Sequence, residues 1–313
     1  MEKILECIKK YDNIIIHGHS RPDGDCIGSQ YGLMHLIKDN FPKKHVYVTG
    51  EMSDYVSFIG EPKIVGEELF SNALSICLDC GNAERLSDMR YKKSLYSIKI
   101  DHHVDSPKYC DYEYIDSTAA SCTQIITEFY IRFKDNLVMS KEAATALYVG
   151  LLTDTGRFKY NSVNSKTFIS ASILLESGID LAYIDNKLSM EEESILRLKG
   201  YCLSKFKITD YGFAYITLTK SEISKFGVDD ESASSLVTSI STIKNCPIWA
   251  LIIESDNGIR VRLRSREPKI NQIASCFNGG GHKLAAGAIL NSWEEVDILI
   301  NEVNELLIEY NRM

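Results

Sequence analysis

A short stretch near the N-terminus carries three side chains that can bind a metal ion. His19, Asp23 and Asp25 lie within seven positions, in the segment His-Ser-Arg-Pro-Asp-Gly-Asp, and they follow the apolar run Ile14–Ile16. That β-branched run predicts a buried strand, and the Pro-Asp-Gly sequence predicts a turn into a helix. A turn can use one aspartate, but turn formation does not explain two aspartates and a histidine together. The pattern therefore favours a functional site over a purely structural role.

Further aspartates and histidines stand where other predicted elements of the first half end. Four of them follow two apolar runs that predict strands, and the fifth follows a predicted helix. Because parallel strands bring their carboxyl ends to one edge of a sheet, where α/β proteins bind ligands, we expect these groups to converge with the first cluster. In chain order they are Asp79, Asp101, His102, His103 and Asp154.

Histidine nitrogens and carboxylate oxygens in one cluster suit Mn²⁺, Mg²⁺, Fe²⁺ or Zn²⁺. Four carboxylates so close together repel one another, and divalent cations neutralise that repulsion. One ion rarely needs so many ligands, whereas two ions about 4 Å apart with a bridging aspartate do. Such a pair of ions clamps a phosphate and acidifies a water molecule. The expected chemistry is therefore hydrolysis of a phosphoester or phosphoanhydride.

The elements that must position these groups alternate between strands and helices along the first half of the chain. This alternation predicts an α/β fold with a mostly parallel sheet and helices on both faces. The expected strands are 13–19, 46–49, 74–79 and 96–100, and the expected helices run from about 26 to 39, 119 to 133 and 141 to 152.

After about residue 188 the pattern changes to that of a smaller α+β domain. Ser292 and Glu295 have the spacing of a capping box at the start of the last helix. We expect three parts: a first domain over 1–188, a connecting helix over 189–205 and a second domain over 206–313. In this half the expected strands are 206–209, 213–218, 248–254, 259–263 and one ending near 290, and the expected helices are 190–204, 232–243 and 293–310.

Composition narrows the class of protein. With 313 residues and 44% hydrophobic content the chain can bury two cores, and its net charge of −8 argues against a general surface for long nucleic acids. No stretch approaches the roughly 20 apolar residues of a membrane span, so no membrane partner is expected. The N-terminal sequence is typical of an amphipathic helix, not of a signal peptide. Nine scattered cysteines without a secretory signal predict free thiols and a cytoplasmic protein.

Basic and glycine-rich segments in the second half are candidates for anion binding. Arg260, Arg262 and Arg264 alternate along a predicted strand, so they share one face, and Arg266 could extend the row. Guanidinium groups match pairs of phosphate oxygens. The glycines at 279–281 leave backbone amides open to the close approach of an anion. A solvated strand face is the alternative, and the presence of both features in one domain favours phosphate binding.

These motifs, in this order, resemble those of the DHH phosphoesterase family. The segment 279–287, Gly-Gly-Gly-His-Lys-Leu-Ala-Ala-Gly, is similar to the signature of the DHH-associated C-terminal domain. The resemblance covers nearly the whole chain and implies a substrate-binding role for residues 206–313. Many relatives carry four glycines before the histidine, whereas Asn278 stands at the first of these positions here, a departure that bears on the length of substrate accepted.

Carried over position by position, the resemblance implies a site for two divalent cations, with Mn²⁺ as the expected ion. One aspartate would bridge the two ions, and the other ligands would divide between them. The implied ligands are His19 and Asp23 for one ion, Asp25, His102 and Asp154 for the other, and Asp79 as the bridge.

The remaining roles also follow from the resemblance. His103 would contact the scissile phosphate or donate a proton to the leaving oxygen. Asp101 would orient a histidine, as metal-site imidazoles usually require. The implied substrate-binding residues are Arg262, Arg264, Ser265, Gly280, Gly281 and His282.

Within the family, the compact two-domain form is similar to bacterial enzymes of the nanoRNase/pAp phosphatase type. This implies hydrolysis of oligoribonucleotides of two to five nucleotides to mononucleotides, and dephosphorylation of 3′-phosphoadenosine 5′-phosphate (pAp). A phosphodiesterase of cyclic-di-AMP, or of its linear product pApA, would use the same site. A manganese inorganic pyrophosphatase shares the metal motifs but not the Gly-Gly-Gly-His element. A nucleotide sensor without catalysis would not need the full ligand set. A homodimer is compatible with the sequence.

Overall fold

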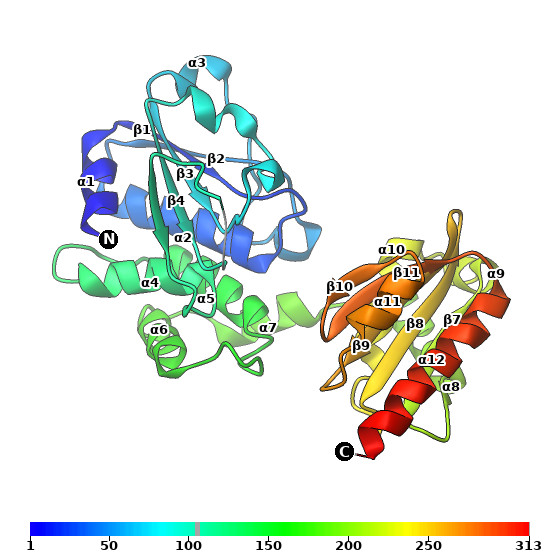
Figure 1. The fold of residues 1–313 in the computed structure, drawn as a ribbon. Helices are drawn as coiled ribbons and strands as arrows, with labels where there is room; N and C mark the ends of the chain where they lie inside the picture. The colour runs from blue at the N-terminus through cyan, green and yellow to red at the C-terminus, as the bar shows by residue number, and fades with distance from the viewer. Residues whose placement is uncertain (104–106, 313) are drawn as a thin grey trace. The chain divides into compact units, whose positions relative to one another are not determined.

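The chain, in a computed structural model that describes residues 1–103 and 107–312, divides into two compact units. The first comprises Met1–Met190 and the second Glu191–Met313 (Figure 1). The α/β class predicted from the sequence is confirmed, because the first unit is built on a parallel sheet and the second on a mixed sheet. Helix α8 (Glu193–Lys205) fills most of the expected connecting segment and packs inside the second unit.

The sheet of the first unit has five strands in the order β2-β1-β3-β4-β5, and every neighbouring pair is parallel. Strands β1 and β3 are buried along most of their length, as their runs of Ile, Leu and Ala predict. The edge strand β5 is half exposed and does not stand out in the sequence. The strands are β1 (Asn13–His17), β2 (His45–Thr49), β3 (Ala73–Leu78), β4 (Tyr96–Asp101) and β5 (Tyr112–Ile115).

Long helices cover one face of this sheet, where the main core of the unit lies. The short helix α3 (Glu67–Phe70) packs on the other face, with Phe70 buried beside Ile15. The larger helices are α1 (Glu2–Lys10), α2 (Gly24–Asn40), α4 (Cys122–Arg132), α5 (Lys141–Asp154), α6 (Ser165–Glu176) and α7 (Leu181–Ser189).

Helices α2 and α5 approach each other unusually closely because α2 presents a stripe of glycines. Gly24, Gly28 and Gly32 are spaced by four and so lie on one face of the helix. A Cβ atom on Gly28 would lie 2.6 Å from the carbonyl oxygen of Ala146 in α5. Gly24 in the first turn of α2 faces Thr153 in the last turn of α5, whereas Gly32 further along α2 faces Leu147. The two helices therefore run in opposite directions. The start of α2 therefore lies beside the end of α5.

The second unit contains a six-stranded sheet in the order β10-β11-β9-β8-β7-β6, in which only β7 and β8 are parallel among the described pairs. Helices α11 (Asn271–Cys276) and α12 (Trp293–Asn311) pack on one face, and α8 and α10 (Asp230–Ser234) on the other. Helix α9 (Lys220–Ser224) follows β7. The strands are β6 (Lys207–Ile208), β7 (Phe213–Leu218), β8 (Ile248–Ser255), β9 (Gly258–Ser265), β10 (Gly280–His282) and β11 (Ala285–Leu290).

Two local predictions in this unit were wrong. The single helix expected over 232–243 is instead the short α10 followed by a 3₁₀ segment over Ser235–Ile240. Serine hydroxyls bond to nearby carbonyl groups there, as Ser235 does to Ser232, and so compete with regular helix formation. The expected capping box is also absent, because Ser292 makes no cap bond and the Glu295 carboxylate accepts from Asn291.

No single helix among those described is long and apolar enough to cross a membrane. Only α6 and α7 taken together meet that length and composition test, and they are bent by 114° at their junction. The nine cysteines are all free thiols, and eight of them are buried.

Candidate metal centre

Three neighbouring strands of the first unit bring polar side chains to the same edge of the sheet. His19 follows β1, Asp79 follows β3, and Asp101 ends β4, and these strands are consecutive in the order β1-β3-β4. The start of α2 adds Asp23 and Asp25, and the close packing of α2 on α5 adds Asp154. The structure therefore brings together groups that are up to 135 positions apart, from His19 to Asp154.

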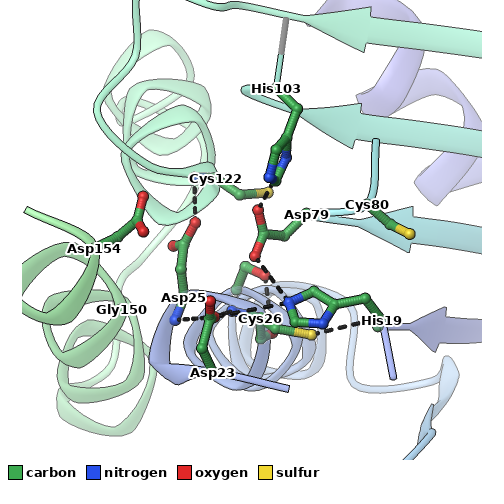
Figure 2. A network of polar contacts seen from close by, with 12 residues as sticks. His19, Asp23, Asp25, Cys26, Asp79, Cys80, His103, Cys122, Gly150 and Asp154 are labelled. Atoms are coloured by element: carbon green, nitrogen blue, oxygen red, sulfur yellow. Dashed lines mark hydrogen bonds and ion pairs between the residues drawn. The ribbon is translucent and has the colours of Figure 1, made fainter. Parts of the chain in front are cut away.

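The side chains form three overlapping sets in which one ligand atom per residue lies within 4.8 Å of the others. Asp79 belongs to two sets, since its Oδ2 is 3.6 Å from Nε2 of His19 and its Oδ1 is 3.4 Å from Nε2 of His102. Figure 2 shows the Asp79 carboxylate between His19 and His103. The sets are His19, Asp23 and Asp79; Asp25, His102 and Asp154; and Asp79, His102 and His103.

Asp79 has the features of a residue held in place for a ligand. Its φ angle of +53° is in the left-handed region, which aspartate tolerates better than most residues. Its backbone N–H donates to the carbonyl of Ile100 at 3.1 Å, so the strained residue is tied to the neighbouring strand. Its Oδ1 is buried and has no hydrogen-bond partner among the described residues. A buried carboxylate oxygen without a donor is what a cation would satisfy.

Electrostatic crowding points to the same conclusion. Burial, together with the charges of Asp79 and Asp23, raises the pKa of Asp154 to about 6. Burial and the same kind of repulsion raise the pKa of Asp25 well above its usual value. Burial by itself lowers the pKa of His102, but its contacts with the surrounding carboxylates outweigh this effect and raise it to about 10. Excess negative charge therefore lies where divalent cations would neutralise it, and the donor set fits them.

Local hydrogen bonds orient two of the candidate ligands, Asp23 and His19. Asp23 caps α2, because its Oδ1 accepts from the N–H groups of Asp25 and Cys26 at 3.0 Å each. His19 contacts the carbonyl oxygen of Ser20 through Nδ1 at 2.9 Å, which makes Nδ1 the protonated nitrogen. Its Nε2 faces the carboxylates of Asp23 and Asp79, and this nitrogen would offer its lone pair to a cation bound there. The turn residues expected from the sequence are thus also candidate ligands.

Asp101 lies behind the cluster and contacts His103. Its Oδ1 accepts from Nδ1 of His103 at 2.7 Å and from the His103 backbone N–H at 3.2 Å. Its Oδ2 lies 3.1 Å from the ammonium nitrogen of Lys99, and both side chains are fully buried. This arrangement fixes the imidazole ring, whose side chain is 40% exposed and therefore accessible.

Lys99 is a residue that our sequence analysis missed. Its ammonium group also donates to the carbonyl of Gly81 at 3.0 Å and lies 4.8 Å from the ring centre of Tyr109. The signal was present, because a lysine in the middle of the apolar run Tyr96–Ile100 must find partners when the strand is buried. Thr123, described below, was missed for a different reason.

In the second unit, strand register joins the arginine row to the glycine-rich segment. Arg262 pairs with Gly287 on β11, which pairs with Gly280 on β10. Arg264 is joined in the same way, through Ala285, to His282. Directly paired residues project from the same face, so Arg264 and His282 share a face with Arg262. Because Gly280 and Gly287 have no side chains, no Cβ atom covers the backbone beside Arg262 at these two positions.

A small cavity of about 290 Å³ opens on this strand and is lined in part by Arg260, Arg262, Asn278 and Gly279. Asn278 has a φ angle of +51°, a conformation that asparagine tolerates, so it can replace a glycine there. Gly281 follows with a φ of +135°. Residues 278–284 are exposed.

The arginines of the row differ in their partners. Arg260 and Arg262 donate to the two carboxylate oxygens of Glu231, at 2.9 and 3.3 Å. Arg264 is half-buried and donates to the carbonyl of Leu263 at 2.9 Å. Arg266 does not extend the row, because its guanidinium bonds to backbone carbonyls at 241 and 243.

Ser265 is placed differently from the other candidates for substrate binding. It alternates with Arg264 on β9, so its side chain projects from the opposite face. Its hydroxyl is buried and has no hydrogen-bond partner in the described parts of the chain. The structure does not bring Ser265 to the face that carries the arginines.

Comparison with known proteins finds two matching families. Residues 13–151 match the DHH family, N-terminal domain, and residues 210–309 match the DHHA1 domain. The first match covers the candidate ligands from His19 to His103 and ends three residues before Asp154, and the second spans the arginine row and the glycines at 279–281.

Individual proteins match along nearly their full length. A Streptococcus mutans protein named "Probable bifunctional oligoribonuclease and PAP phosphatase NrnA" is 40% identical over 305 residues, covering 97% of this chain and 98% of the relative. The Bacillus subtilis "Bifunctional oligoribonuclease and PAP phosphatase NrnA" is 33% identical, with 98% and 99% covered. The crystal structure of an exopolyphosphatase-related protein from Bacteroides fragilis matches with a TM-score of 0.85 at 31% identity, covering 99% of this chain and 95% of that one.

Proposed function

The chain belongs to the DHH family, and on this basis we propose that it is a metal-dependent phosphoesterase that hydrolyses short oligoribonucleotides to mononucleotides and dephosphorylates pAp. The names of relatives that match over almost the whole chain support this substrate class. The hydrolase class follows from the family and from the cluster of His and Asp side chains at the sheet edge.

The single observation that carries the proposal is the position of Asp79 between two sets of ligands. It contacts His19 through one carboxylate oxygen and His102 through the other, and the second oxygen is buried with no donor among the described residues. A bridging carboxylate between two cations needs this arrangement. We propose that Asp79 bridges two Mn²⁺ ions, with His19 and Asp23 on one side. Asp25, His102 and Asp154 would bind the other ion.

When bound, the two cations would act as Lewis acids on the scissile phosphate and on a water molecule. The chain itself supplies orientation and a proton. His103 donates to Asp101 through Nδ1, so its Nε2 is the nitrogen available to contact the phosphate or the leaving ribose oxygen. The hydrogen bond that His103 donates to Asp101 raises the pKa of His103, which favours the protonated ring that a proton donor requires.

We propose that the arginine row binds phosphate groups of the substrate. Arg262 carries this role because it lies beside the bare backbone of Gly287 and Gly280, where an anion can reach the strand closely. Arg264 and His282 share that face. Gly281, next to it, has a φ angle of +135°, a conformation that favours glycine. Ser265, on the opposite face, would act only through the backbone.

The test is a panel of substrates at one enzyme concentration with Mn²⁺. The panel contains a 5′-labelled RNA dimer, a pentamer and a 24-mer, together with pAp, cyclic-di-AMP and pyrophosphate. We expect conversion of the dimer, the pentamer and pAp, with the 24-mer left behind. Consumption of cyclic-di-AMP or pyrophosphate alone would keep the metal centre and overturn the substrate class. No turnover of any compound would overturn the proposal.

We also propose that the protein works in the cytoplasm. Nine free thiols, eight of them buried, suit a reducing compartment. Expression with a fluorescent tag and fractionation of the cells would test this, and recovery of the protein outside the cytoplasm would contradict it.

A further inference from the structure

The carboxylate of Asp25 is held by the first turn of helix α4, which lies 97 and 98 positions away in the sequence. Its Oδ2 accepts from the N–H of Cys122 at 2.6 Å. Its Oδ1 accepts from the N–H of Thr123 at 2.9 Å and from the Thr123 hydroxyl at 2.7 Å. Figure 2 shows Asp25 below Cys122, with Gly150 of α5 beside it.

Counting acceptor positions identifies which oxygen is left for a cation. A carboxylate oxygen has two lone pairs, and both lone pairs of Oδ1 are used by Thr123. Oδ2 receives only one described hydrogen bond and is the oxygen that faces His102, whose Nε2 is 3.9 Å away. Thr123 therefore decides which oxygen of Asp25 points into the cluster.

The Thr123 hydroxyl is itself oriented by a short chain of hydrogen bonds. Its single proton goes to Asp25, so its 2.8 Å contact with the Ser121 hydroxyl requires Ser121 to donate. Ser121 can do so because its oxygen accepts from the N–H of Gln124 at 3.0 Å. All of these side chains are buried. The donor and the acceptor of each of these hydrogen bonds are thereby determined.

Packing leaves Thr123 little room to move. A Cβ on Gly150 would collide with the methyl group of Thr123 and would lie 3.1 Å from Oδ1 of Asp25. The glycine thus lets α5 close over this pair. The hydroxyl and methyl groups of Thr123 and the carboxylate of Asp25 are therefore closely packed against α5.

We propose that Thr123 is a positioning residue that fixes Asp25 for cation binding and sets the affinity of the Asp25 side of the metal centre. The inference rests on the proposed function, because it assumes that Asp25 is a ligand. Partners of this kind behind a metal ligand typically change metal affinity by about 10–100-fold when they are removed.

The test compares three variants with the wild-type chain by calorimetric titration of the EDTA-treated protein with Mn²⁺. Thr123→Val keeps the shape and removes the hydroxyl, and Thr123→Ser keeps the hydroxyl and removes the methyl group. Thr127→Val is the matched control, since Thr127 is a buried threonine of the same helix whose hydroxyl donates to the carbonyl of Thr123 at 2.8 Å and has no other hydrogen-bond partner within residues 1–103 and 107–312. Thermal unfolding of each variant accompanies the titration.

We expect Thr123→Val to weaken one of two Mn²⁺ positions by about 10–100-fold, with Thr123→Ser and Thr127→Val close to the wild type. Activity of Thr123→Val on an RNA dimer should then return at high Mn²⁺ concentration. Wild-type affinity in Thr123→Val, or equal weakening in Thr127→Val or Thr123→Ser, would overturn the inference while leaving the proposed function intact. A wild-type chain that binds no Mn²⁺ would overturn both.

Discussion

Nδ1 of His103 donates a 2.7 Å hydrogen bond to the Asp101 carboxylate, and His103 also belongs to one of the three sets of candidate ligands. The Asp101 side chain is fully buried, whereas the His103 side chain is 40% exposed. A buried carboxylate thus holds one nitrogen of an accessible imidazole and leaves the other nitrogen to the substrate. In the proposed reaction this geometry assigns proton donation to His103 and its orientation to Asp101.

Replacing His103 should damage the chemical step more than cation binding. We expect His103→Asn to lower kcat by about 10²–10⁴-fold, which is the usual contribution of a positioned acid. Asp101→Asn should lower kcat by about 10–100-fold, because the ring remains but loses its charged partner. Steady-state kinetics on an RNA dimer and Mn²⁺ titration check both variants. A kcat of His103→Asn within about threefold of the wild type would contradict this role.

Arg262 and its ion-pair partner Glu231 should have opposite effects on substrate binding when they are replaced. Arg262→Gln removes a charged donor and should raise KM for an RNA dimer by about 10–100-fold, from a loss of roughly 1.5–3 kcal/mol. Glu231→Gln should instead lower KM by up to about fivefold, because Glu231 competes for Arg260 and Arg262 in an exposed ion pair. A rise in KM for both variants would show that Glu231 supports the substrate and does not compete with it.

The glycine stripe of α2 predicts a stability effect that reaches the metal centre. A Cβ on Gly28 would lie 2.6 Å from the carbonyl of Ala146 and 2.9 Å from the backbone nitrogen of Gly150. Gly28→Ala should therefore cost about 1–3 kcal/mol and weaken Mn²⁺ binding, because it separates α2 from the helix that carries Asp154.

Gly200 provides the control, since a Cβ at that position in α8 meets nothing within 4 Å. Gly200→Ala should stabilise the chain by about 0.5–1 kcal/mol and leave Mn²⁺ binding unchanged. Thermal unfolding followed by circular dichroism, together with Mn²⁺ titration, checks both variants. Unchanged stability in Gly28→Ala would contradict the close packing of α2 and α5.

Asp88 should make the stability of the first unit depend on pH in the acid range. Burial raises the pKa of Asp88, but hydrogen bonds from Arg90 and Thr49 outweigh it and lower the pKa to about 2. The unfolded value is about 3.9, so the unfolded chain takes up the proton first as the pH falls. The stabilisation is fully present above about pH 4 and is lost as the pH falls towards 2.

Asp88→Asn isolates this effect. At pH 6 the wild type should exceed the variant in free energy of unfolding by on the order of 1 kcal/mol, and at pH 2 most of this difference should be lost. Urea unfolding with EDTA present, followed at both pH values, measures the difference without any contribution from bound metal. A difference that is the same at both pH values would rule out this linkage.

Much of the candidate metal centre could be predicted because its residues carry local signals. Apolar β-branched runs that end in His19, Asp79 or Asp101 predict strands, and parallel strands meet at one edge. Glu231 and Thr123 could not be found in this way. Glu231 contacts Arg262, which is 31 positions away in the sequence, and Thr123 contacts Asp25, which is 98 positions away. No local sequence pattern predicts either contact.

The helix expected over 232–243 was predicted wrongly for an identifiable physical reason. Serine hydroxyls around Ser235 bond to nearby carbonyl groups and interrupt the helix expected over 232–243. Alternation along β9 places Ser265 on the face opposite Arg264, a consequence of the strand period that could have been drawn from the sequence itself. Its part in substrate binding stays a prediction.

The central claim is that Asp79 joins two cation positions, and counting Mn²⁺ ions tests it most directly. Calorimetric titration of the EDTA-treated chain should give two Mn²⁺ per chain for the wild type and for Asp116→Asn, a nearby aspartate outside the three ligand sets. Asp79→Asn should lose tight binding at both positions and lower kcat by at least about 100-fold. Two tightly bound ions in Asp79→Asn, or fewer than two in the wild type, would contradict the bridging role.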